Sequence, residues 1–456
     1  MKRKIALMLA AALAVLAAGC SAGAPGEEGV VRIAFADGSI TAPETDGCEV
    51  DGTELTITEP GSYLLTGSCP DGLVKVKKGT AGVRLILSDL TLQSKTSAPI
   101  VCGKSSVVTI EAAAGTQNTL RDTEKNNDES HSKNKKAENA VIKCRDGAQV
   151  TLCGAGSLTI ESSGKNGIKS GSRDTESGQD AFLTVREMAL TVDAAENDAI
   201  NAEQLLNVES GTLVLDTPSK ALHCDYTMNI GGEGTEGPDI TIGSAYEGLE
   251  AAEVNICSGH LDITSTDDCI NAANSELTGY DFAIHISGGA IRAYASEGDG
   301  FDANGSITIS GGEVQVWTAN TADNQPLDAD DLVNITGGTV LAIGGSCGMG
   351  TSVHAEQPYA VFGNTQRFDP QQAESAQNAQ AILKKGSEFA ITSAEGTALY
   401  TGTAKCGVNY AVYSSPDLAD GAEYTLTAGD TRLQENAQTG TVIQQEMLGP
   451  KPRNAP

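Results

Sequence analysis

A short polar motif recurs through the middle of the sequence, and its oxygen-rich side chains could bind a metal ion. Each copy reads polar, small, apolar, polar and usually Ala, as in Asp198-Ala199-Ile200-Asn201-Ala202. Ca²⁺ prefers carboxylate, amide and carbonyl oxygens, in sets of roughly six to eight. The candidate calcium ligands are Asp198, Asn201, Glu247, Glu250, Asp267, Asp268, Asn271, Asp299, Asp302, Asp328 and Asp330.

The spacing of the motif predicts the elements that must position these side chains. The apolar centres of successive copies, from Ile168 to Met349, lie 21 to 32 residues apart. Most copies are followed by a strand, a Ser-Gly-Gly type turn and a second strand, as in Ile307 to Val316. Such periods are typical of solenoids, in which each repeat buries its apolar face against its neighbours. We therefore predict an all-β chain folded as a right-handed, single-stranded parallel β-helix. A β-propeller is the structural alternative, but its blades are longer and richer in aromatic residues.

In this fold the polar positions of successive copies stack at one corner. Neighbouring strands lie about 4.8 Å apart, so stacked carboxylates repel each other unless a cation lies between them. This expectation favours bound calcium over solvated turn residues for the run of acidic copies. The copies with Lys169, Lys220 and His223 lack the negative charge and are predicted to hold no ion.

Catalysis is the alternative use of the same residues. A lyase would need a basic side chain near the calcium, and Lys220 and Arg292 are the nearest candidates. A glycoside hydrolase would need two clustered carboxylates, which the Asp267-Asp268 pair or Asp299 with Asp302 could supply. Regular repetition favours a structural or binding role, so no catalytic residue is assigned.

Aromatic side chains near the repeat could stack on sugar rings. Trp317 and Tyr294 both lie on the strand that follows a Gly-Gly turn. These two are the candidate carbohydrate-binding residues, with coverage of the side wall as the alternative role.

The N-terminus resembles a bacterial lipoprotein signal. A basic start precedes an apolar run from Ile5 to Ala18, which is short for a membrane span. It ends in Leu16-Ala17-Ala18-Gly19-Cys20, similar to a lipobox. That resemblance implies a signal peptide over 1–19, lipid on Cys20, and a protein anchored on the outer face of the bacterial cell membrane.

The rest of the chain divides by pattern. We predict a flexible tether over 20–45, the β-helix over 46–350 and a small C-terminal β-hairpin cap over 351–435. A disordered tail is expected over 436–456. Residues 121–138 are rich in Asn and Lys and are interpreted as a mobile, charged surface insertion.

Composition limits the partners. The formal net charge is −30, which disfavours nucleic acid and acidic surfaces and suits a neutral polymer or a metal cation. An acidic polysaccharide would need a cation as a bridge. The 11 cysteines show no CxxC pair, so most are read as buried core residues, with Cys48 and Cys69 as one pair to test for a disulfide.

These pieces together resemble the clostridial-type carbohydrate-binding domain-containing proteins with a pectate-lyase-like β-helix. The matching segments include Gly61 to Gly67, Gly154 to Ile160, the Ile-Ser-Gly-Gly strands and Ser414 to Leu418. The resemblance spans about residues 50–430 and implies a calcium-stabilised β-helix that binds plant cell-wall polysaccharides such as cellulose or polygalacturonate. Lys169 and Lys220 depart from its acidic pattern.

Function is therefore predicted as calcium-dependent polysaccharide binding by a monomeric cell-surface lipoprotein without catalysis. A polysaccharide lyase or hydrolase is the first alternative. A surface adhesion protein with a protein partner is the second.

Overall fold

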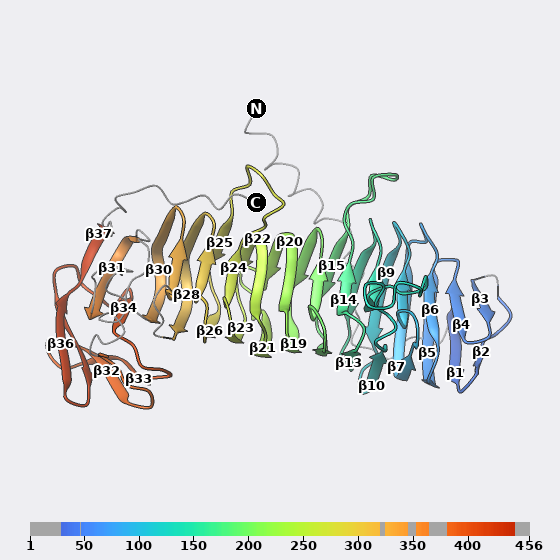
Figure 1. Ribbon diagram of the computed structural model, residues 1–456, viewed down its shortest axis with the longest axis horizontal. Coiled ribbons are helices and arrows are strands. Elements are labelled where there is room, and N and C mark those ends of the chain that lie inside the picture. Colours follow the sequence, from blue (N-terminus) through green and yellow to red (C-terminus); the bar gives the residue numbers. More distant parts are fainter. Residues whose placement is uncertain (1–28, 46, 320–323, 345–352, 364–380, 443–456) are drawn as a thin grey trace.

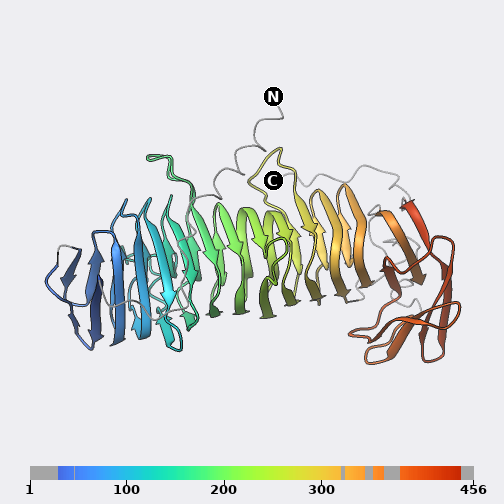
Figure 2. The same cartoon turned by 180° about the vertical axis from the view of Figure 1, so that it is seen from behind.

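The computed structural model describes residues 29–45, 47–319, 324–344, 353–363 and 381–442. The described residues form strands and turns only, which confirms the prediction of an all-β chain. Most strands belong to one large sheet and lie side by side along the long axis of the molecule (Figures 1 and 2).

Parallel pairing arranges most strands into three stacks, because each strand pairs with its equivalent in the next repeat. The first stack contains the apolar centres of the motif. It runs through β4 (Glu54–Ile57), β6 (Leu73–Val76), β8 (Ile100–Cys102), β11 (Ala140–Cys144), β14 (Asn166–Ser170), β17 (Ile200–Ala202), the first parts of β20 (Lys220–Ile230) and β22 (Glu247–Ile256), β24 (Ile270–Ala272), β27 (Phe301–Ala303) and β29 (Leu327–Ala329).

The second stack follows the first in every repeat. It contains β1 (Val30–Ala36), β5 (Gly61–Cys69), β7 (Val83–Gln93), β9 (Val107–Ala112), β12 (Gln149–Cys153), β15 (Phe182–Val185), β18 (Leu205–Val208), the later parts of β20 and β22, β25 (Ala283–Ile286), β28 (Ser306–Thr318), β30 (Leu332–Gly344) and β31 (Val353–Gly363).

The third stack completes each repeat. It contains the ends of β5 and β7, then β10 (Gln117–Arg121), β13 (Ser157–Ser162), β16 (Ala189–Ala194), β19 (Gly211–Asp216), β21 (Pro238–Ser244), β23 (His260–Ser265), β26 (Ala290–Ala295) and the later parts of β28 and β30.

Alternating burial along the strands builds one continuous core from the three stacks. Strand β16 alternates exposed and buried residues, so its Leu190 and Val192 face the same core as Ile200 of the motif. Because parallel pairing keeps the alternation in register, each apolar centre stacks on the next, as Ile200 does on Leu222. Gly211 shows why glycine begins a strand here, since it has a positive φ and a Cβ would meet the Met188 carbonyl oxygen at 2.4 Å.

Both ends of the large sheet contain antiparallel strand pairs, unlike the parallel pairs between them. At the N-terminal end β2 (Ser39–Thr41) and β3 (Cys48–Asp51) pair antiparallel with β1 and β4. At the other end β34 (Tyr410–Ser414) pairs antiparallel with β30 and β31. A separate antiparallel sheet follows the order β33 (Ala398–Thr403), β32 (Glu388–Ser393), β35 (Glu423–Ala428) and β36 (Thr431–Asn436).

The structure corrects both terminal boundaries. Val30–Ala36 is not tether but strand β1, which pairs in parallel with β5. Residues 438–442 are not tail but strand β37 (Gln438–Val442), which pairs antiparallel with β31. The partner of β37 lies far away in the chain, so local composition could not reveal that pairing, whereas β1 pairs both with the adjacent β2 and with β5 in the next repeat.

The cysteines are mostly core residues. Cys144 and Cys269 are fully buried, whereas Cys257 is partly exposed. The Cys48–Cys69 disulfide is absent, because both thiols are free.

Candidate functional site

One outward-facing position of the first stack forms a continuous row, called here the polar column. It is the fourth residue of each motif copy, directly after the apolar centre. Parallel pairing places the row in the order Lys143, Lys169, Asn201, His223, Glu250, Asn271, Asp302 and Asp328. The column therefore runs from cationic to anionic along the molecule, a gradient that becomes visible only when the repeats are in register.

Asp198 lies beside the middle of the column and already has a full set of partners. Its carboxylate accepts hydrogen bonds from Asn201 Nδ2 at 2.7 Å and Ser219 Oγ at 2.6 Å. His223 Nδ1 lies 3.0 Å from Asp198 Oδ2. Burial alone would raise the pKa of Asp198, but the hydrogen bond and charge of His223, with the other two donors, lower it to about 2.

Cations neutralise the neighbouring carboxylates in the same way. Lys220 Nζ lies 2.5 Å from Glu250 Oε2, and Lys169 Nζ lies 3.1 Å from Glu203 Oε1. His223 Nε2 faces the carboxylates of Asp225 and Glu250 at 3.5 and 3.8 Å. This part of the column is therefore stabilised by its own side chains.

At Glu247 and Glu250, two carboxyl groups share the single lysine Lys220, so the positive charge no longer balances the negative charge. Burial, the hydrogen bond with Glu250 and the Glu250 charge together raise the pKa of Glu247 to about 9. Burial would also raise the pKa of Glu250, but the hydrogen bonds from Glu247 and Lys220 lower it overall. Glu247 Oε2 is buried without a hydrogen-bond partner. The pair therefore retains a proton near neutral pH.

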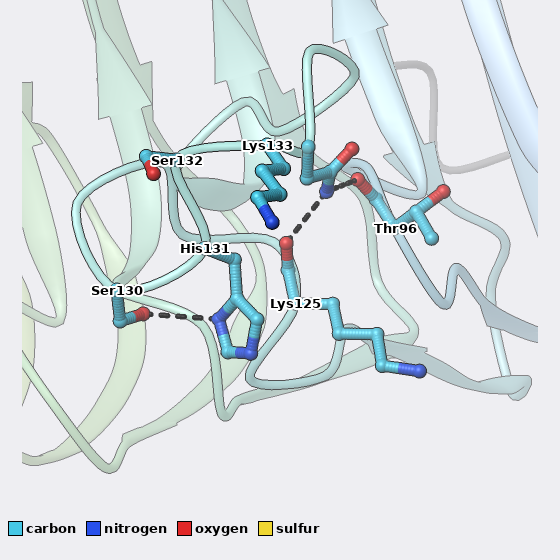
Figure 3. A pocket seen from close by; sticks show the side chains of 7 residues that line it. Thr96, Lys125, Ser130, His131, Ser132 and Lys133 are labelled. Carbon is cyan, nitrogen blue, oxygen red and sulfur yellow. Dashed lines mark hydrogen bonds between the residues drawn. The ribbon is translucent and has the colours of Figure 1, made fainter.

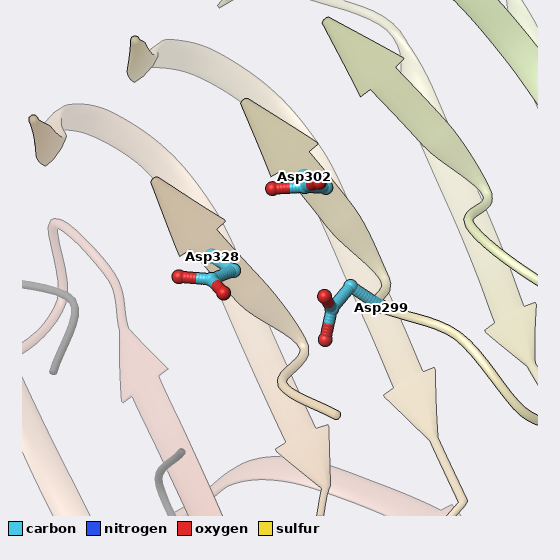
Figure 4. A group of neighbouring side chains, drawn as sticks. All are labelled: Asp299, Asp302 and Asp328. Atoms are coloured by element: carbon cyan, nitrogen blue, oxygen red, sulfur yellow. The ribbon is translucent and has the colours of Figure 1, made fainter. Parts of the chain in front are cut away.

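Three aspartates meet where the column is acidic (Figure 4). Asp299 precedes β27, Asp302 lies on β27 and Asp328 lies on β29, and one carboxylate oxygen from each lies within 4.8 Å of the others. Asp299 occupies the first position of its motif copy, so the copy supplies two of the three carboxylates. We call these three residues the aspartate cluster.

Burial and mutual repulsion make the ionised cluster unfavourable. Burial raises the pKa of Asp299 to about 8, with Asp328, Asp268 and Asp302 adding to the shift. Burial likewise raises the pKa of Asp268 to about 7. Backbone amides oppose this only in part, as Asp299 N donates to Asp268 Oδ1 at 2.7 Å and Gln325 N donates to Asp299 Oδ1.

The donor set of the cluster fits a hard divalent cation. Every candidate ligand is an oxygen, which suits Ca²⁺ and disfavours softer metals. Asn271 Oδ1, the preceding member of the column, is buried without a hydrogen-bond partner. An amide oxygen in that state could serve as a further neutral ligand beside Asp302.

Six predicted ligands lie apart from the cluster: Asp198, Asn201, Glu247 and Glu250 in the preceding repeats with the partners described above, and Asp267 and Asp330. Asp267 accepts a hydrogen bond from Tyr246, at the corner before the motif copy. Asp330 follows β29 and is exposed. The structure thus brings together Asp299, Asp302 and Asp328, with Asp268 and Asn271 beside them, and separates Asp267 and Asp330 from that group.

The candidate catalytic bases are not placed for catalysis. Lys220 is paired with Glu250. Arg292 lies in the third stack, where its register partners are Asp262 and Gln315. Neither side chain is directed by its strand toward the aspartate cluster.

The predicted sugar platform at Trp317 and Tyr294 is wrong for Trp317, which is only 2% exposed. Its ring packs edge-on against Phe389, with centroids 5.9 Å apart, inside a second core formed with the C-terminal strands. Tyr294 packs partly buried against the same core, and Lys405 Nζ lies 6.0 Å from its ring centroid. The sequence could not show that distant strands cover this wall.

Other aromatic rings are exposed instead. Tyr246 is 48% exposed and Tyr226 is 41% exposed, on opposite edges of the first stack. Tyr226 packs edge-on against Tyr280 with centroids 6.2 Å apart. Both exposed rings lie beside motif copies, Tyr246 before Glu247 and Tyr226 after Cys224, and this position in the sequence is the signal that indicates them.

Cys20 lies outside the described residues, so its predicted lipidation stays a prediction. Among the residues that the structure describes, no helix is long and apolar enough to cross a membrane.

Comparison with known proteins places these features in a family. The model of the family described as "Carbohydrate-binding domain-containing protein" matches residues 51–348 and 235–395. A protein of that description from Acetivibrio thermocellus is 36% identical over 139 residues, which are 30% of this chain and 47% of the relative. The chain therefore matches about half the length of this relative.

A solved structure is also similar. It is described as the polysaccharide lyase-like protein from C. thermocellum, gadolinium derivative, with 24% identity and a TM-score of 0.38 over 67% of this chain and 96% of that one. The family match extends over most of the chain, from the first repeats through the aspartate cluster. The chain belongs to the carbohydrate-binding domain-containing protein family.

Proposed function

We propose that this protein is a non-catalytic, cell-surface lipoprotein that binds plant cell-wall polysaccharide through a calcium-stabilised, right-handed parallel β-helix. The family match over residues 51–395 is the observation that carries the carbohydrate-binding role. The aspartate cluster supports the calcium, and the N-terminal motif supports the lipid anchor at Cys20.

Three parallel stacks support the β-helix. The chain visits the first, second and third stack in turn, and each strand then pairs with its equivalent one repeat later. A chain that circles one core in this way is a solenoid in which every repeat is one coil. The coils hold the motif copies in register, and this register produces the polar column.

Calcium supplies the positive charge that the acidic end of the column lacks. Asp299, Asp302 and Asp328 would hold the ion, with Asn271 Oδ1 as a neutral ligand beside them. Asp268 contributes a further negative charge, because it shifts the pKa of Asp299 upward. The ion would also offer a bridge to carboxylates of an acidic glycan, which the net charge of −30 otherwise repels.

A retention experiment tests the proposal. The protein without its first 28 residues is passed over immobilised cellulose and cross-linked polygalacturonate in calcium and in EDTA. Retention on one of the polymers in calcium, reduced in Asp299→Asn/Asp302→Asn/Asp328→Asn, is the expected result. Absence of retention on every plant polysaccharide tested would contradict the binding role.

A further inference from the structure

The insertion at residues 121–138 is built into the fold by hydrogen bonds. Asn126 is fully buried, and its Nδ2 donates to Asp122 Oδ2 at 2.9 Å and to the Ala140 carbonyl oxygen at 2.8 Å. Its Oδ1 accepts from Glu138 N at 2.7 Å. Asp122 Oδ1 accepts from Ser163 N at 2.7 Å in the next repeat. The segment expected to be a mobile insertion is thus tied to the large sheet at both ends.

A pocket of about 520 Å³ lies within this insertion (Figure 3). The lining residues are Thr96, Lys125, Ser130, His131, Ser132, Lys133 and Asn134. Asn134 Nδ2 donates to the carbonyl oxygens of Thr96 at 2.7 Å and Lys125 at 2.6 Å, which fixes one wall to the other. Its volume falls within the range of about 300–1,000 Å³ that is typical of small-ligand sites.

The charge of the pocket contrasts with the rest of the molecule. The chain has 60 acidic residues and 30 lysines and arginines, yet no carboxylate lines this pocket. Among the described residues, Lys125 and Lys133 form no ion pair within 4 Å, unlike Lys136, which pairs with Glu54. Both lysines line the pocket and are exposed, with side chains that extend in different directions (Figure 3), so each ammonium group is available to an external anion.

Three carboxylates of the insertion have partners outside the pocket. Glu129 pairs with Lys165 at 2.6 Å, and Glu138 pairs with Arg145. Asp128 accepts a hydrogen bond from Asn139 Nδ2 at 2.8 Å. These pairings engage three carboxylates elsewhere, whereas Glu124, next to Lys125 in the sequence, is exposed and does not line the pocket.

We propose that this pocket binds the carboxylate-bearing sugar units of an acidic polysaccharide. Lys125 and Lys133 would bind the carboxylate, since ammonium groups are strong point-charge partners for anions. Ser130, Ser132 and His131 offer hydrogen-bonding groups suited to sugar hydroxyls. The proposal rests on the polysaccharide-binding function, and it gives the protein a second, calcium-independent contact with an acidic glycan.

The test is a calorimetric titration in EDTA, so that calcium cannot bridge protein and sugar. The ligands are galacturonate trimer, the neutral galactose trimer and inorganic sulfate. Wild-type protein should bind the galacturonate trimer and not the neutral trimer, and binding should weaken as salt is added because ionic contacts are screened. Lys125→Ala/Lys133→Ala should weaken binding at least tenfold.

Lys384→Ala/Lys385→Ala is the matched control, because it removes two exposed lysines outside the insertion. It should bind like wild type, and unfolding curves should show that all variants fold. Equal binding by wild type and Lys125→Ala/Lys133→Ala would overturn the proposal, as would sulfate binding as tightly as the acidic sugar. If the pocket does not bind the acidic trimer but calcium-dependent retention is intact, only the pocket proposal fails. If the trimer binds in EDTA but calcium-dependent retention is absent, only the calcium-dependent part of the proposed function fails.

Discussion

The middle and the acidic end of the polar column are built from the same repeat, yet their carboxylates have different partners. In the middle, His223 and Asn201 contact Asp198, and Lys220 pairs with Glu250. At Asp302 the neighbours are Asn271 on one side and Asp328 on the other. The first arrangement is complete without a ligand, whereas the proposed calcium would complete the second. If calcium binds there, the same repeat carries an ion-pair network in one region and a metal site in another.

Removal of calcium should produce the largest effect, and only the acidic end should respond. A ligand present at a hundredfold its dissociation constant stabilises a protein by about 2.7 kcal/mol. We expect EDTA to lower the unfolding temperature of wild-type protein and to leave that of Asp299→Asn/Asp302→Asn/Asp328→Asn unchanged. Thermal unfolding monitored by circular dichroism would measure this. Equal unfolding temperatures of wild type in calcium and in EDTA would contradict the proposal that a cation stabilises the acidic end and not the Asp198 region.

Loss of the Asp198 carboxylate should have the next largest effect, and it should not depend on calcium. The pKa of Asp198 is lowered from 3.8 to about 2, and each pKa unit corresponds to about 1.4 kcal/mol. Asp198→Asn should therefore lower the free energy of unfolding at neutral pH by about 2 kcal/mol, as measured by urea unfolding. Asp193→Asn, an exposed aspartate on β16, is the control and should change it by less than about 0.5 kcal/mol.

The stability contributions of the Asp198 region and of the acidic end should also depend on pH with opposite signs. Asp198 has a lowered pKa in the folded state, so its contribution is present above about pH 4 and is lost as the pH falls toward 2. Asp268 and Asp299 have pKa values raised to about 7 and about 8, so the folded state binds their protons more tightly than the unfolded state. In EDTA their contribution is therefore present below about pH 4 and is lost as the pH rises toward 8.

The slope of this loss should approach about 1 kcal/mol per pH unit for one such group. Urea unfolding at several pH values between 5 and 8, in EDTA and in saturating calcium, would measure it. Calcium should flatten the dependence, because the ion favours the ionised carboxylates. Identical pH profiles in EDTA and calcium would show that the aspartates are not linked to a metal.

A single neutral substitution should have the smallest effect, and its sign should depend on the medium. Asp299→Asn removes one half-buried carboxylate that its neighbours repel, so in EDTA we expect a gain in stability of about 1 kcal/mol at pH 8. In calcium the same variant should be less stable than wild type because it loses a ligand. Destabilisation in both media would indicate that Asp299 stabilises the fold without a metal.

The sequence predicted the core of the repeat better than its surroundings. Ile200, Leu222 and Leu249 stack as expected, because period and alternation are local properties of the chain. Local patterns could not predict that His223 completes the partners of Asp198, since the two residues lie in different repeats. They also could not predict the burial of Trp317, which depends on strands formed more than 60 residues later.

The path of the insertion over residues 121–138 could not be predicted from local sequence either. Its composition indicated a charged, mobile surface segment, but the buried Asn126 and its bonds to Asp122 and Ala140 fix its path. A polar residue gives no sign in the sequence that it will be buried, because burial depends on hydrogen-bond partners that only the folded chain provides.

The central claim is that a cation completes the acidic end of the polar column, whereas the region around Asp198 is completed by its own side chains. Calorimetric titration of metal-free protein with calcium chloride is the most direct test of this claim. We predict heat of binding in wild type and in Asp198→Asn, and its loss in Asp299→Asn/Asp302→Asn/Asp328→Asn. Calcium binding that persists in this triple variant, or that disappears in Asp198→Asn while the protein stays folded, would contradict the account.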